Sequence, residues 1–185
     1  MRDSFAEIMK SVGKDVRTEP SLLPVTGEKL PAGANVKDGA RSDVSALSIW
    51  NPLCKAFFDI RVFNPLASSN WEKDVEKMYV KHEKEKKTEY NERILQIEKG
   101  TFTPLVFSCT GGAGSESTKL IKHLAKLIAD KKQEPYSQVV NIIRRRIRFD
   151  ILRCCNLSLR GFRGQNNFDS LEDIEYDLCP DQNKF

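Results

Sequence analysis

The stretch "KAFFDIRVFNP", residues 55–65, decides the fold, because it combines the composition of a buried strand with two charges in its middle. Side chains two apart on a strand share a face, so Asp59 and Arg61 point one way, while Phe58, Ile60 and Val62 point the other way, into a core. A buried charged pair without compensation costs several kcal/mol. We therefore expect this pair either at a solvated rim of the sheet or in a site that uses the two charges.

The rest of the chain predicts helices and strands on both sides of this strand. Apolar spacing and Gly or Pro breaks indicate a helix at 3–12, strands at 15–25, 41–50 and 55–63, a highly charged helix at 71–99, a strand at 101–110, a helix capped by Ser115, and a last helix at about 136–155. Strands mixed with crossover helices predict an α/β domain with a mixed central sheet flanked by helices. We expect this domain over residues 1–163, followed at 164–185 by an acidic, disordered tail.

Composition argues against secretion and against a membrane span. No run approaches the roughly 18 apolar residues that a span requires, and "MRDSFAEIMKSVGKD" at residues 1–15 lacks the apolar core of a signal peptide. The five cysteines form no C-x-x-C pair, which favours free thiols in a reducing compartment over a zinc cluster. We expect an intracellular protein, nuclear or cytoplasmic, without membrane attachment.

Two carboxylates are placed to form a metal site. Asp43, in "RSDVS", precedes Asp59 by one predicted strand and one turn. If the two strands pair, the carboxylates converge and offer the hard oxygen ligands that Mg²⁺ or Mn²⁺ prefers. Arg61 beside them could hold a phosphate or stabilise developing negative charge.

The pattern D-x(15)-D-x-R, from Asp43 to Arg61, resembles the signature of PD-(D/E)XK nucleases, which have a restriction-endonuclease-like αβββαβ core. The resemblance implies a metal held by Asp43 and Asp59, with Glu7 on the preceding helix as a possible third acid. Arg61 stands where the family usually has lysine, and an arginine is not interchangeable with it. Lys86 on the long helix could replace that lysine, but a lysine whose stem follows the apolar stripe to reach water is the more ordinary explanation.

A second resemblance spans residues 2–163. The blocks "KAFFDIRVFNP", "KTEYNERILQIEKGTFTPLVFSCTGGAG" and "NIIRRRIRFDILRCCNLSLRG" are similar to a domain that recurs in transposon-like open reading frames of animal genomes, often near reverse-transcriptase sequences. This similarity implies a mobile-element origin.

The last predicted helix is strongly basic. Residues 131–163 carry a net charge of +7, whereas residues 165–185 carry −5. A basic patch suggests a nucleic-acid partner, most simply DNA, and a solvated basic helix is the alternative. We expect the contacts from Arg144, Arg145, Arg146 and Arg148.

Other motifs are weaker. "GGAGSESTK" lacks the ending of a P-loop, so a tight turn into a helix is expected more than a phosphate site. His82-Glu83 is interpreted as a pair on a helix surface.

Three functions are compatible with the sequence. The first is a Mg²⁺-dependent phosphodiesterase acting on DNA, in which Asp43 and Asp59 hold the metal and Arg61 or Lys86 stabilises the pentavalent phosphorus. The second is a catalytically inactive copy that binds nucleic acid. The third is a protein-interaction module, against which the basic helix counts.

Overall fold

The computed structural model describes residues 1–22, 41–70 and 73–160, so the predicted tail at 164–185 lies outside the described residues. In chain order the main elements are α1 (Arg2–Lys10), β1 (Lys14–Thr18), β2 (Val44–Leu47), β3 (Lys55–Phe63), α2 (Val75–Gln96), β4 (Thr101–Ser108), α3 (Ser115–Lys132) and α4 (Tyr136–Arg160). A short 3₁₀ turn, Ser68–Asn70, precedes α2. None of the helices in the described part of the chain has the length and apolar content to cross a bilayer.

The strands form one mixed sheet in the order β1-β2-β3-β4. The first three strands are antiparallel neighbours, whereas β4 runs parallel to β3 over its whole length, from Ala56 opposite Thr101 to Phe63 opposite Ser108. Parallel strands require a crossover connection, and α2 supplies it. The α/β class with a mixed sheet is therefore as predicted.

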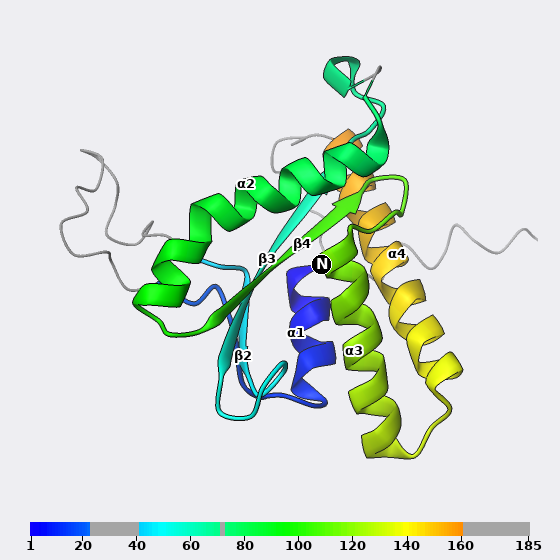
Figure 1. Cartoon of the computed structure of the whole chain (residues 1–185). Helices are drawn as coiled ribbons and strands as arrows, with labels where there is room; N and C mark the ends of the chain where they lie inside the picture. Colours follow the sequence, from blue (N-terminus) through cyan, green and yellow to red (C-terminus); the bar gives the residue numbers. More distant parts are fainter. Residues whose placement is uncertain (23–40, 71–72, 161–185) are drawn as a thin grey trace, which may run out of the picture.

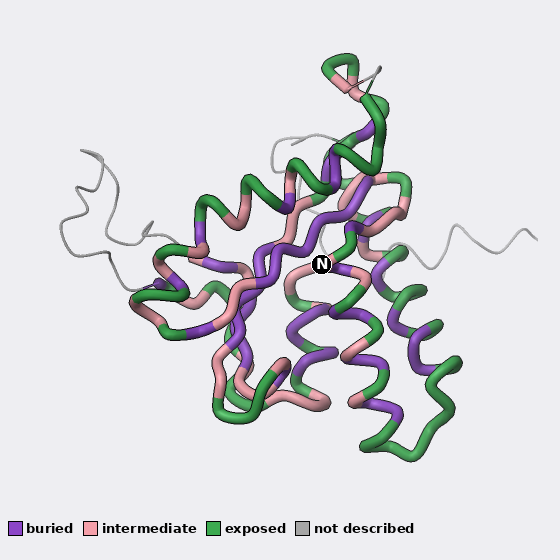
Figure 2. Tube along the Cα trace, in the orientation of Figure 1, coloured by how far each residue is buried: buried purple, intermediate pink, exposed green. Residues whose placement is uncertain are grey.

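Helices cover both faces of this sheet (Figure 1). Phe58 of β3 is fully buried in a core shared with α1, α3 and α4, whereas its neighbour Phe57 packs with Tyr90 and Ile94 of α2. Figure 2 shows the buried residues along the strands and on the sheet-facing sides of the helices. We call the face of the sheet that α2 covers the α2 face. Because side chains two apart on a strand share a face, Asp59 lies on the α2 face together with Phe57.

One residue of β3 departs from the predicted pattern. Val62, expected in the core, is 37% exposed, although its partner on β4, Phe107, is buried. The pairing of β2 with β3 ends at Val44 opposite Phe58. Beyond that point β3 has no neighbour on this side within the described chain, so Val62 lies at an open edge.

The ends of two helices also differ from the predicted ones. Helix α2 begins at Val75, where the carboxylate of Asp74 accepts a hydrogen bond from the backbone N–H of Glu76 and caps the helix. Helix α3 has Gly114 as its N-cap rather than the predicted Ser115.

Helix α4 buries the predicted apolar stripe, which consists of Val139, Val140, Ile143, Ile147 and Ile151.

Candidate functional site

The paired strands β2 and β3 place Asp43 and Asp59 opposite each other. Asp43 comes directly before β2, one step beyond the last matched pair, Val44 and Phe58. Its Oδ2 atom accepts a hydrogen bond from the backbone N–H of Ile60 at 2.6 Å. Burial raises the pKa of Asp59, and the negative charge of Asp43 adds to this rise.

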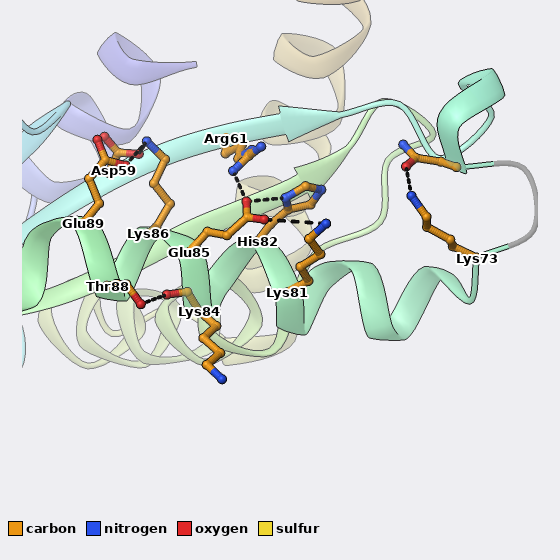
Figure 3. Close-up of polar contacts among 11 residues, drawn as sticks. Asp59, Arg61, Lys73, Lys81, His82, Lys84, Glu85, Lys86, Thr88 and Glu89 are labelled. Carbon is orange, nitrogen blue, oxygen red and sulfur yellow. Dashed lines mark hydrogen bonds and ion pairs between the residues drawn. The ribbon is translucent and has the colours of Figure 1, made fainter.

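Asp59 is nearly buried and faces a lysine of α2. Only 6% of the residue is exposed, and the Nζ atom of Lys86 lies 3.0 Å from its Oδ2 atom. Lys86 also contacts Glu89 at 3.3 Å and lies over the ring of Tyr90. Figure 3 shows Asp59, Lys86 and Glu89 converging between β3 and α2. Lys86 thus occupies the position beside Asp59 that the sequence suggested for it.

The charges at this point do not balance. Burial raises the pKa of Asp59, the charges of Asp43 and Glu89 raise it further, and the contact with Lys86 only partly opposes them. Burial lowers the pKa of Lys86, but its contact with Asp59 and the charges of Asp59 and Glu89 outweigh burial and the net shift is upward. Lys86 therefore has two carboxylate neighbours, Asp59 and Glu89, and its single positive charge does not neutralise both.

Arg61 does not pair with Asp59. Its guanidinium lies 2.7 Å from Oε2 of Glu85, one residue before Lys86 on α2, and both side chains are partly exposed. The same carboxylate lies 3.2 Å from Nδ1 of His82, and the contacts with His82 and Arg61 lower the pKa of Glu85. The two charges of β3 are thus matched by two opposite charges on neighbouring residues of α2, which explains how the strand carries them on one face.

Glu7, predicted as a possible third metal ligand, does not join Asp43 and Asp59. Helix α1 packs on the face of the sheet opposite α2. The Glu7 carboxylate is exposed and lies 2.6 Å from Nζ of Lys10. Across residues 1–22, 41–70 and 73–160, no three His, Cys, Asp or Glu side chains gather closely enough to share one metal ion. Any metal here would rest on Asp43 and Asp59.

Helix α4 holds the predicted nucleic-acid-binding residues on its solvent side. Arg144, Arg145, Arg146 and Arg148 are all exposed, and none makes an ion pair within the described part of the chain. Because α4 packs with α1 and α3, this basic surface lies on the face of the sheet opposite α2. Asp59 and the basic helix are therefore on different faces of the sheet.

Glu83 is a buried charged residue that the sequence interpretation placed on the surface. It is 7% exposed. Its two carboxylate oxygens accept hydrogen bonds from the backbone N–H of Glu116 at 3.0 Å and from the hydroxyl of Ser115 at 3.1 Å. The positive end of the α3 dipole favours a carboxylate at that point. Glu83 of α2 thus supplies the negative charge at the start of α3. The glycine-rich turn before α3 is therefore interpreted as structural rather than as a phosphate site.

Comparison with protein-family models, with curated proteins and with solved structures finds no match to this chain.

Proposed function

We propose that the chain is a divalent-metal-dependent nucleic-acid phosphodiesterase, similar to a DNA endonuclease and of mobile-element origin. The observation that carries the proposal is the placement of Asp43 opposite Asp59, with Nζ of Lys86 3.0 Å from Asp59. The order helix, three strands, helix, strand also agrees with the αβββαβ core that the PD-(D/E)XK resemblance implies.

The residues present suit Mg²⁺ or Mn²⁺. Magnesium is commonly held by one or two carboxylates and keeps several of its waters, so Asp43 and Asp59 suffice as protein ligands. Oδ2 of Asp59 is buried and, apart from its ion-pair contact with Lys86, has no hydrogen-bond partner among the described residues. A divalent cation would add positive charge beside Asp59 and so oppose the burial and the neighbouring carboxylates that raise its pKa. When bound, the cation would polarise the phosphodiester and neutralise developing charge.

The protein's own side chains have distinct roles in this proposal. Asp43 and Asp59 supply the negative charge that retains the cation. Lys86 has a raised pKa and stays protonated at neutral pH, so it acts as a donor to a phosphoryl oxygen rather than as a base. Arg61 points to the same side of β3, about 6–7 Å further along the strand, where it could hold an adjacent phosphate.

A second candidate is a catalytically inactive nuclease-fold domain that binds nucleic acid or a protein partner. The observation in its favour is that both charges of β3 already have partners on α2: Asp59 with Lys86 and Arg61 with Glu85. Asp59 is also almost closed to solvent. The presence of Arg61 where the resemblance implies lysine also favours a catalytically inactive domain.

One set of measurements separates the two candidates. Plasmid DNA is incubated with Mg²⁺ or Mn²⁺ and wild type, Asp59→Asn, or the control Asp130→Asn, which changes an exposed acid of α3 on the opposite face. The phosphodiesterase proposal expects cleavage by wild type and control but not by Asp59→Asn. It also expects Mg²⁺ to raise the thermal midpoint of wild type and control only, because a ligand that binds the folded state stabilises it.

The other outcomes have definite meanings. Equal cleavage by wild type and Asp59→Asn would assign the activity to a contaminant or to another site. Absence of cleavage and of any Mg²⁺-dependent stabilisation, with DNA still bound by the wild type, would reject the phosphodiesterase and support the inactive domain.

A further inference from the structure

A hollow of about 240 Å³ lies between α4, α3 and the turn that follows β4. Its polar walls are the side chains of Arg144 and Arg148 and the hydroxyl-bearing residue Thr118, with Gly111 at the turn and Ile147 among the apolar residues. A water occupies about 30 Å³ in the liquid, so the hollow could hold a group several times larger than one water. It uses no residue of the site around Asp59 and lies on the opposite face of the sheet.

The two arginines bring an uncompensated charge to this hollow. Arg144 and Arg148 are four residues apart on α4, so they lie one above the other on the same side of the helix. Neither makes an ion pair with another described residue. The acid at the start of α3, Glu116, does not line the hollow and is held by Lys87 at 2.9 Å and by Lys119 at 3.6 Å. The charge of the two guanidiniums is therefore available to a ligand.

The backbone N–H groups of three glycines near this turn already have hydrogen-bond acceptors within the protein. The backbone N–H of Gly111 donates to the carbonyl of Ser108, and the N–H of Gly112 donates to the Ser108 hydroxyl. Gly114 likewise donates to the carbonyl of Val106. Because these groups are used within the turn, recognition in the hollow depends on the guanidiniums and on Thr118.

We propose that this hollow binds a phosphate group, held by Arg144 and Arg148 with the Thr118 hydroxyl as a further donor. A guanidinium presents parallel N–H groups that match two phosphate oxygens, and two guanidiniums match a group with several anionic oxygens better than they match a single carboxylate. The phosphate would belong either to a monoester or to a nucleic-acid backbone. This second site goes beyond the proposed phosphodiesterase, since it requires neither a metal nor Asp59.

The test is the binding of inorganic phosphate to the full chain, measured by calorimetry at low ionic strength. We expect Arg144→Gln/Arg148→Gln to bind phosphate at least tenfold more weakly than wild type. The matched control is Arg153→Gln on the same helix, which removes an exposed guanidinium that does not line the hollow. Control and wild type should have the same affinity. Equal loss in control and double variant, or no phosphate binding by wild type, would overturn the proposal.

Two further measurements sharpen the result. Arg144→Lys/Arg148→Lys keeps the charge but removes the planar donors, so it should bind phosphate more weakly than wild type and more tightly than the Gln variant; affinity equal to wild type would reject guanidinium recognition. A short oligonucleotide is then compared with and without a terminal phosphate. Preference for the phosphorylated form identifies a monoester site, and equal affinity that falls in the Gln variant identifies a backbone site. Cleavage is not read in either experiment, so failure here leaves the phosphodiesterase proposal separately testable.

Discussion

Replacing Lys86 with methionine tests whether Asp59 is held as a buried anion. Methionine keeps much of the length and the apolar stem of lysine but removes the ammonium group that lies 3.0 Å from Asp59. Asp59 is then left beside Asp43 and Glu89, whose charges already raise its pKa. The folded protein must accept a buried, unpaired carboxylate or must protonate it.

The size of the effect follows from burial and distance. Two unit charges 3.0 Å apart attract by about 5.5 kcal/mol at an effective dielectric constant of roughly 20. Breaking a buried pair by removing one partner typically costs about 3–5 kcal/mol. The Lys86 side chain remains 19% exposed, so we expect Lys86→Met to lower the free energy of unfolding by about 3 kcal/mol at pH 7, near the low end of that range.

The loss should depend on pH in a known direction. The folded-state pKa of Asp59 is raised, and removing Lys86 raises it further, so the folded state binds a proton more readily than the unfolded state does. The stability of the variant is then fully retained below the unfolded pKa of an aspartate, about 3.9, and falls as pH rises through the folded pKa. The difference between wild type and Lys86→Met should therefore shrink by up to about 1.4 kcal/mol per pH unit on acidification from pH 7.

Urea unfolding at pH 5 and pH 7 measures both effects, with Lys84→Met on the exposed side of the same helix as control. A second variant, Asp59→Asn/Lys86→Met, removes both charges and should recover part of the loss, because no unpaired charge is then buried. A loss below about 1 kcal/mol at pH 7, or a loss that does not change between the two pH values, would refute the reasoning.

Three other predictions concern single side chains. Glu83→Ala should lower the free energy of unfolding by about 2 kcal/mol, because it removes the carboxylate at the start of α3; in the same urea assay the exposed control Glu92→Ala should change little, and equal effects would contradict the capping role. Arg61→Lys should alter stability by less than about 1 kcal/mol, because its ion pair is partly exposed, and should retain any cleavage; a loss of cleavage would assign the catalytic cation to Arg61. Replacing Arg145 and Arg146 with alanine should weaken nucleic-acid binding for all sequences and flatten the slope of log K against log salt by up to about two units, with an unchanged unfolding midpoint; an unchanged slope would remove these two residues from the binding surface.

The apolar periodicity of the sequence is sufficient to predict the elements and their order. The shared face of Asp59 and Arg61 follows from the two-residue period of any strand, and the position of Lys86 on the inner stripe of α2 follows from helical spacing. These are local properties of one strand or one helix. They do not depend on which neighbour packs against the element.

The errors have a common physical origin. The PD-(D/E)XK resemblance implies Glu7 as a third metal ligand, but neither the resemblance nor the period of a helix reveals which face of the sheet the helix covers. The sequence predicts Glu83 on the surface because α2 carries many carboxylates, and only the position of the α3 N-terminus selects this one for burial. It predicts Val62 in the core because the alternation of a strand does not show where its neighbouring strand stops. Each error concerns a contact between elements rather than a property of one element.

The separation of the two charged regions constrains how the proposed functions combine. Asp59 and Lys86 lie at the α2 face of the sheet, whereas the arginines of α4 lie on the opposite side of the domain. Binding by α4 would therefore not bring a phosphodiester to Asp59 through the same contacts. Asp59→Asn should leave the nucleic-acid affinity contributed by α4 unchanged, and the Arg145/Arg146 double variant should leave Mg²⁺-dependent stabilisation unchanged. If instead one substitution abolishes both properties, the two regions act on one bound strand, and the separation across the sheet does not govern function.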